Sequence, residues 1–458
     1  MAVFIRSSSM PTTARELADW HFRSGAIDRL LPPWEDVEVL ERPGAMADGA
    51  VARFRMRKFG IGIEWVARHH DVHPGRGFSD TQERGPFRSW VHRHSFLPEG
   101  DRASMLEDRV QYELPGGVLG RALGGRTVAA DLERMFAWRH QRTRHDLQHH
   151  AAFPGERLRV AVSGTGGLVG GSLVPFLSTG GHDVRRIVRG KADAARGDVA
   201  WDTRSSSFDA RALAGLDAVV HLAGAGIADV RWSEERKREI VASRVGPTAS
   251  LARTLASLER KPRVLVCASA IGWYGDRPAP QRVDEDSAIG EGFLAETCEA
   301  WERATDAARD AGIRVVNLRI GVVLSARGGA LAKLLPPFRM GLGGAVGSGE
   351  QGMSWIDLDD LLGAVRFVMS ADVHGPVNAV APEPCSNREF GRTLGRAIGR
   401  PAVAPLPAPA VRAMFGEMGE RLLLEGAYVR PARLQQLGFR WALPDLEAAF
   451  RFETGSFA

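Results

Sequence analysis

The segment from Ser163 to Gly170 reads SGTGGLVG, with glycines at 164, 167 and 170. An apolar run, RVAVS, precedes it and predicts a buried strand, while the residues after it predict a helix. The first glycine would permit a tight turn, the second would let the backbone approach a pyrophosphate, and the third would let the helix pack on the strand. A glycine triplet can also be only a turn, but the strand–turn–helix context favours a dinucleotide site. The predicted cofactor contacts in this loop are Gly164, Thr165, Gly166, Gly167, Leu168, Val169 and Gly170.

The next predicted strand, HDVRRIVRG, should end near Arg189. NAD-specific proteins usually place an acidic residue there for the ribose hydroxyls, whereas an arginine would pair with a 2′-phosphate. The sequence therefore predicts NADP(H), with NAD(H) less favoured. The alternative is that Arg185, Arg186 and Arg189 are merely exposed charges at a strand end.

Two later strands complete the predicted cofactor site. Asp202 ends the third strand, where its carboxylate could meet the adenine amino group. Leu222, Ala223 and Gly224 follow the fourth strand, where small residues would let the backbone run beside the cofactor. Apolar strands alternate with helices from residue 158 onward, which predicts an α/β Rossmann fold with a doubly wound parallel sheet.

The region before residue 151 is of another kind, because it holds ten of the 13 histidines and no glycine-rich nucleotide motif. A short helix over residues 11–22 is followed by alternating segments that predict an antiparallel sheet, and residues 128–149 predict a long helix across one face. This is an α+β pattern. The predicted domains are residues 1–150, 157–400 and 401–458.

Histidine pairs in the predicted sheet invite a metal-site interpretation. They are His69 and His70 with His73, and His92 with His94. Strand alternation is expected to scatter these side chains, and no carboxylate spacing supports a site, so no metal is predicted.

Several strings along the chain also resemble known families. SGTGGLVG, ASAIGWYGD, GEGFLAETCEAWE, LRIGVVLS and MSWIDLDDL, in this order, resemble the atypical extended short-chain dehydrogenases called sugar-nucleotide-epimerase-like proteins, over residues 157–450. GEMGERLLLEGAYVRPARLQQLGF resembles their C-terminal domain of unknown function, a small α/β domain that would complete the substrate cleft. WHFRSGAIDRLLPPWE and LEDRVQYELPGG resemble the START-like, helix-grip cyclase/dehydrase family. That resemblance implies an apolar cavity for a lipid- or polyketide-sized ligand, although the domain could also be a packed accessory.

The dehydrogenase resemblance implies a Ser, Tyr, Lys catalytic set. Ser269 matches the serine position, but the segment GFLAETCEAWE contains neither tyrosine nor lysine. Tyr274 is the nearest phenol and could carry the proton or pack on the nicotinamide. Depending on register, the tyrosine and lysine positions hold Phe293 and Thr297, or Leu294 and Cys298. Cys298 could be a reactive thiol or a small buried residue.

Composition bounds the remaining possibilities. The net charge of +5 comes from arginines spread along the chain, so no nucleic-acid partner is predicted. No apolar run approaches the ~20 residues of a membrane span, and a cytoplasmic location is expected. Arg231, Lys237 and Arg244 could meet an acidic substrate or simply solvate a helix.

The sequence as a whole favours an NADP(H)-dependent oxidoreductase or epimerase-like enzyme acting on a small carbonyl or hydroxyl compound. The alternative is an NADP(H)-binding sensor or apolar-ligand-binding protein whose catalysis has been altered. Sugar-nucleotide epimerisation is the weakest of these hypotheses because the Tyr/Lys pair is missing.

Overall fold

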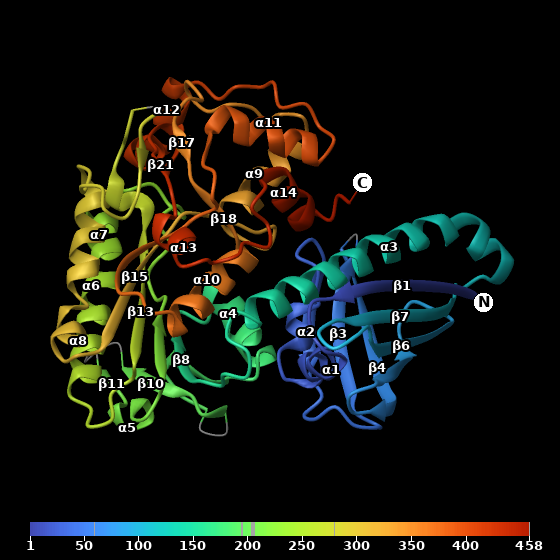
Figure 1. Cartoon of the computed structure of the whole chain (residues 1–458). Coiled ribbons are helices and arrows are strands. Elements are labelled where there is room, and N and C mark those ends of the chain that lie inside the picture. Colours follow the sequence, from blue (N-terminus) through green and yellow to red (C-terminus); the bar gives the residue numbers. More distant parts are fainter. Residues whose placement is uncertain (59, 194–195, 203–206, 279, 458) are drawn as a thin grey trace. The chain divides into compact units, whose positions relative to one another are not determined.

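The computed structural model describes residues 1–457 apart from 59, 194–195, 203–206 and 279. The chain forms two compact units, shown in Figure 1. One unit comprises Met1–Pro154, Ser178–Gly181 and Phe452–Ala458, and the other comprises Gly155–Leu177 and His182–Arg451. Residues 401–451 thus group with the Rossmann unit, and a separate domain beginning at residue 401 stays a prediction.

The first unit is built on an antiparallel sheet with the strand order β1-β7-β6-β5-β4-β3-β2 among the described residues. The helix α3 (Gly117–His150) packs on its inner face, where Leu132 and Phe136 of α3 join Trp90 and Val110 of the sheet in one buried cluster. A curved sheet gripping one long helix confirms the predicted helix-grip architecture (Figure 1). The other elements are β1 (Ala2–Met10), α1 (Ala14–Phe22), α2 (Ala26–Arg29), β2 (Asp36–Glu41), β3 (Val51–Lys58), β4 (Ile61–His73), β5 (Gly77–Arg84), β6 (Ser89–Pro98) and β7 (Ser104–Glu113).

The second unit contains the predicted Rossmann sheet, with the order β11-β10-β9-β8-β12-β13-β15-β19. The order reverses between β8 and β12, which creates the crevice where dinucleotides bind in such folds. The strands are β8 (Arg159–Ser163), β9 (Asp183–Arg189), β10 (Val199–Asp202), β11 (Ser207–Phe208), β12 (Ala218–His221), β13 (Val264–Ala270), β15 (Arg314–Ile320) and β19 (Gly375–Ala379). All the pairings are parallel except that of β11 with β10.

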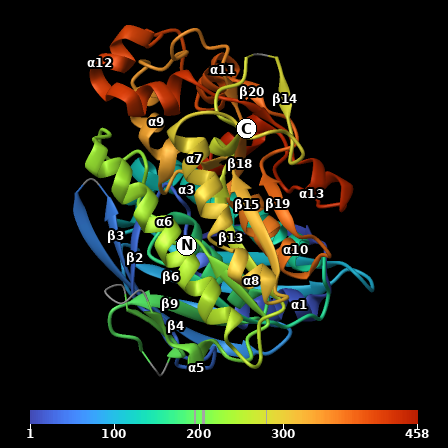
Figure 2. The ribbon, with the colours of Figure 1, turned by 90° about the vertical axis from the view of Figure 1, so that its left-hand side faces the viewer.

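Helices cover both faces of this sheet. Figure 2 shows α6 (Glu234–Ala256), α7 (Phe293–Arg303) and α8 (Asp306–Asp310) in front of β13 and β15. Leu251 and Leu255 of α6 pack there on Val219 and Leu265 of the sheet. The helices α4 (Leu168–Thr179) and α10 (Leu358–Ser370) lie on the opposite face (Figure 1). No described helix combines the length and the apolar character needed to span a membrane.

Short strand pairs tie the last part of the chain to the Rossmann unit. β14 (Arg282–Val283) pairs with β21 (Tyr428–Val429), β16 (Val322–Leu324) with β18 (Trp355–Asp357), and β17 (Gly352–Met353) with β20 (Cys385–Ser386). The remaining elements are α5 (Ala210–Leu213), the 3₁₀ turn η2 (Ile271–Tyr274), α9 (Gly329–Arg339), α11 (Asn387–Ala397), α12 (Ala408–Gly419), the π-helical turn η3 (Glu420–Leu424), α13 (Ala432–Gln436) and α14 (Leu446–Thr454).

Candidate functional site

The glycine loop joins β8 to α4, as the sequence predicts. Gly164 has φ 73°, and a Cβ there would lie 2.7 Å from the carbonyl carbon of Leu222. A Cβ at Gly170 would lie 2.4 Å from the carbonyl oxygen of Gly164. Glycine is therefore required by the turn at one end of the loop and by close helix packing at the other.

A pair of buried hydrogen bonds at the end of β8 holds the glycine loop in place. The Ser163 hydroxyl oxygen accepts the Leu222 N–H at 3.1 Å and lies 2.8 Å from Nδ1 of His221. Burial lowers the pKa of His221 to about 4, so its ring is neutral near pH 7 and can accept the Ser163 proton. The two loops that line the crevice are thus held to each other.

The predicted cofactor residues lie together at the carboxyl ends of neighbouring strands. β9 ends at Arg189, β10 ends at Asp202, and Leu222, Ala223 and Gly224 follow β12 directly. This is the edge at which open α/β sheets bind their ligands. The strand ends fall where the sequence predicts them.

The three arginines of β9 have different surroundings. Arg186 makes a bidentate pair with Asp198 at 2.9 and 2.6 Å, and Arg185 donates to the carbonyl oxygen of Ala212 at 3.1 Å. The Arg189 side chain is exposed and has no hydrogen-bond or ion-pair partner within the described residues. Among the described residues, Arg189 is therefore the arginine of the three whose guanidinium has no protein partner.

The opposite wall of the crevice comes from later parts of the chain. A Cβ at Gly328 would lie 3.7 Å from Cδ1 of Leu168, so the turn before α9 packs on the glycine loop. Lys333 of α9 donates to the carbonyl oxygen of Ala228 at 2.8 Å. The loop after β12 therefore contacts both the glycine loop and α9.

The basic residues after β12 are bonded to protein atoms. Arg231 donates to Ala413 at 3.3 Å, and Lys237 pairs with Glu417 at 3.1 Å, which attaches α12 to this segment. Arg244 donates to the carbonyl oxygen of Ala225 at 2.9 Å. These contacts account for the three cations without a substrate, and their contact with an acidic substrate stays a prediction.

Ser269 and Tyr274 lie in one buried polar network with residues that the sequence analysis did not single out. The Ser269 hydroxyl donates to Glu302 at 2.7 Å, and Arg319 binds both oxygens of that carboxylate at 2.8 and 3.0 Å. Arg319 also donates to the Tyr274 hydroxyl at 3.1 Å, and that hydroxyl donates to Asn378 at 2.8 Å. A charged residue inside the apolar strand VVNLRI was the one sequence signal for this network.

The hydroxyl groups of Ser269 and Tyr274 are both buried in the structure. Ser269 is 3% exposed and Tyr274 0% exposed. Burial raises the pKa of Tyr274 to about 12, even though the nearby Arg319 opposes that shift. The two side chains brace the end of β13 and the turn after it, and their participation in proton transfer stays a prediction.

The helix α7 begins at Phe293 and carries the positions where a Tyr/Lys pair is missing. Thr297 donates its hydroxyl back to the Phe293 carbonyl at 2.6 Å, and Cys298 lies 3.6 Å from the carbonyl oxygen of Ala270. Burial raises the pKa of Cys298 to about 12, so the thiol stays protonated near pH 7. Of the two interpretations offered by the sequence, the structure favours the small buried residue.

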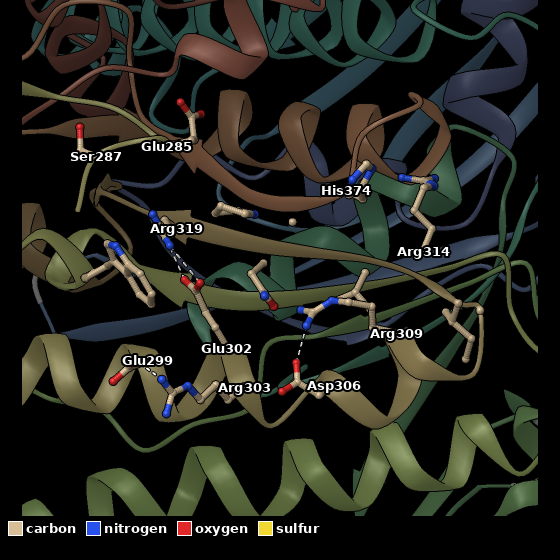
Figure 3. Close-up of a pocket in the computed structure, with 17 residues that line it drawn as sticks. Glu285, Ser287, Glu299, Glu302, Arg303, Asp306, Arg309, Arg314, Arg319 and His374 are labelled. Atoms are coloured by element: carbon tan, nitrogen blue, oxygen red, sulfur yellow. Dashed lines mark hydrogen bonds and ion pairs between the residues drawn. The ribbon is translucent and has the colours of Figure 1, made fainter. Parts of the chain in front are cut away.

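A separate groove of about 780 Å³ lies beside β15, β19 and the helices α7 and α8. Figure 3 shows Glu302 and Arg319 pointing toward each other within it, with the pairs Glu299–Arg303 and Asp306–Arg309 along the helices. No residue of the glycine loop lines this groove. Its charges largely neutralise one another, whereas Arg189 at the crevice has no partner among the described residues. We therefore place the candidate site at the crevice.

The expectation that the N-terminal histidines are scattered is wrong for two of them. His92 and His94 stand two residues apart on β6, so both side chains point to the same face of the sheet. The register sets Asp80 of β5 opposite His92 and Asp108 of β7 opposite His94. Cross-strand pairing supplies the carboxylates whose spacing along the chain gave no signal.

Comparisons with known proteins agree with this arrangement. Residues 160–380 match the NAD dependent epimerase/dehydratase family, residues 406–453 a domain of unknown function, and residues 24–138 the polyketide cyclase/dehydrase and lipid transport family. An epimerase family protein of Mycobacterium bovis is 43% identical over 283 residues, which are 62% of this chain and 93% of that protein.

Two solved structures extend the likeness. The human epimerase family protein SDR39U1, crystallised with NADPH, is 36% identical with a TM-score of 0.59, over 64% of this chain and 98% of its own. A crystal structure described as the nucleoside-diphosphate sugar epimerase from Corynebacterium glutamicum is 33% identical with a TM-score of 0.80, over 99% of this chain and 90% of that one. The fold and the glycine-loop crevice define a protein of the extended short-chain dehydrogenase class. Within that class the chain belongs to the epimerase family represented by these relatives.

Proposed function

We propose that the protein is an NADP(H)-dependent oxidoreductase that acts on a small carbonyl or hydroxyl compound in the crevice beside the glycine loop. The observation that carries the proposal is Arg189, which has no partner among the described residues and lies at the end of β9, next to the strand that leads into the glycine loop. The human relative that was crystallised with NADPH supports the same cofactor.

The bound cofactor would supply hydride transfer, and the chain's own residues would bind and orient it. N–H groups at the start of α4 would face the diphosphate, Arg189 the 2′-phosphate and Asp202 the adenine amino group. Leu222, Ala223 and Gly224 would run beside the cofactor. The contacts of α9 and α12 with the loop after β12 support a substrate cleft that residues 401–458 help to close.

Single-turnover oxidation of NADPH against a carbonyl library tests the activity. Formation of NADP⁺ together with one reduced compound supports the proposal. Tight NADPH binding with no turnover across a broad library would count against an oxidoreductase and leave only the cofactor site.

A second function is favoured by the absence of the Tyr/Lys pair from α7. The positions of that pair hold Phe293 and Thr297 or Leu294 and Cys298, and the Cys298 thiol stays protonated. An NADP(H)-binding sensor that carries an apolar ligand in the helix-grip unit would need no such pair. Titration of a fluorescent fatty acid with and without NADPH tests this function, because coupled sites must change each other's affinity. Equal affinities would remove its support.

A further inference from the structure

The inner face of the N-terminal sheet gathers imidazole and carboxylate groups in two adjacent cross-strand rows. Asp80 and His92 form one row, and His94 and Asp108 form the other. All four residues are nearly buried, with exposed fractions of 9%, 4%, 8% and 3% respectively. Groups of this kind are seldom buried unless they are paired or bind a metal.

Three of these residues point ligand atoms at a common space. Asp80 Oδ2 lies 3.2 Å from Nδ1 of His92 and 3.9 Å from Nε2 of His94. The three residues can each offer one ligand atom such that all three atoms lie within 4.8 Å of one another. Four-coordinate zinc with bonds near 2.1 Å holds its ligand atoms ~3.4 Å apart, so small side-chain adjustments suffice.

The second nitrogen of each imidazole already faces a carboxylate. Asp108 Oδ1 lies 3.0 Å from Nε2 of His92 and 2.7 Å from Nδ1 of His94, while its Oδ2 lies 2.7 Å from Nε2 of His140. Metal-binding histidines usually donate their other ring N–H to such a carboxylate, which fixes the tautomer and the ring orientation. Nδ1 of His94 is close to Asp108 but makes no hydrogen bond of good geometry, so a small rotation of this ring would complete its contact with the carboxylate.

We propose that Asp80, His92 and His94 form a binding site for one divalent first-row transition metal ion in the helix-grip unit, with Asp108 orienting both imidazoles. Two imidazoles and one carboxylate are a set used for zinc and for non-haem iron(II), and they suit magnesium and calcium poorly. Three protein ligands leave a further coordination position for water or a ligand oxygen. The half-buried Arg139 interacts electrostatically with both carboxylates, and the metal would share their charge with it.

The competing explanation is a metal-free network in which a charged His92 bridges the two aspartates. The proposal and this network make different predictions about Zn²⁺. We expect the chelator-stripped full chain to bind one Zn²⁺ tightly in competition with a chromophoric chelator, and Mg²⁺ not to compete. Anaerobic Fe²⁺ in a second titration distinguishes the two metals, since it should bind at the same stoichiometry and more weakly than Zn²⁺.

Three single substitutions test which residues bind the metal. His94→Gln should abolish the stoichiometric binding, and Asp108→Asn should weaken it ~10–100-fold through loss of the orienting carboxylate. His73→Gln is the matched control, because His73 is an exposed histidine at the end of β4 and should leave the affinity unchanged.

Spectroscopy of the metal bound to the unsubstituted protein tests the site without relying on variants, which could fail to fold. Co²⁺ bound at this site should show the visible ligand-field bands of a low-coordinate nitrogen and oxygen environment, and zinc X-ray absorption should show two imidazoles. Absence of saturable Zn²⁺ binding in the unsubstituted chain would overturn the proposal and leave the metal-free network. Equal losses in His94→Gln and His73→Gln would overturn it as well.

Discussion

Replacement of Arg189 by alanine gives the sharpest test of the cofactor site. Arg185 and Arg186 are already bonded to Ala212 and Asp198, so Arg189 is the cation of β9 left to meet a 2′-phosphate. Charge-assisted hydrogen bonds contribute up to ~3 kcal/mol when shielded, and exposed ion pairs contribute less than ~1 kcal/mol. A bidentate contact at the rim of a crevice lies between these limits, which corresponds to a loss of ~5–30-fold in NADPH affinity.

Titration calorimetry with both cofactors separates this effect from general damage. NADH lacks the 2′-phosphate, so its affinity should change less than ~2-fold in Arg189→Ala. Arg159→Ala removes the same charge at the amino end of β8, beside Asp217, and should leave both affinities unchanged. Added salt should weaken the NADPH preference of the unsubstituted protein and have little effect in Arg189→Ala. An unchanged NADPH/NADH affinity ratio, or equal losses for both cofactors, would refute the assignment of Arg189.

Three further predictions concern packing and protonation. Gly170→Ala should abolish cofactor-induced thermal stabilisation while the circular dichroism spectrum is kept, because its Cβ would lie 2.4 Å from a loop carbonyl oxygen; stabilisation equal to that of the unsubstituted chain would contradict the packing argument. Glu302→Gln leaves the buried Arg319 without its carboxylate and should lower the free energy of unfolding, measured by chemical denaturation, by ~3–5 kcal/mol. Glu299 is more exposed, so Glu299→Gln should lower it by less than ~1 kcal/mol, and similar losses in the two variants would refute the role of burial. Because burial raises the pKa of Cys298 to about 12, its thiol should resist a disulfide reagent at pH 8 in the native protein and react only after denaturation; rapid native reaction that Cys298→Ala removes would contradict this protonation state.

The Rossmann unit could be predicted because its signals are local. Most of the parallel strands are short apolar runs, and the glycine loop is recognisable within eight residues. The ends of β9 and β10 at Arg189 and Asp202 therefore followed from the sequence, although β9 itself carries three arginines. Family resemblance added the order of the motifs and the missing Tyr/Lys pair. A second resemblance, to the START-like cyclase/dehydrase family, pointed to the helix-grip unit.

Some elements escaped prediction because their local signal is weak. The strand β5, GFSDTQER, is polar and follows a glycine turn, yet its first four residues are buried between β4 and β6. The helix α3 begins at Gly117, eleven residues before the predicted start, within a glycine-rich stretch of low helix propensity. Pairing and packing with the rest of the unit override propensity in both places.

The sequence by itself determined the α/β fold, the glycine loop and the arginine at the end of β9, since each depends on residues that are close along the chain, and family resemblance added the helix-grip fold. Only the tertiary structure decided that Ser269 and Tyr274 share a network with Glu302 and Arg319, and that Asp80 faces His92. The physical reason is register. Which side chains meet across a sheet or between a strand and a helix depends on alignments between distant segments, and shifting a strand by one residue would turn each side chain to the other face.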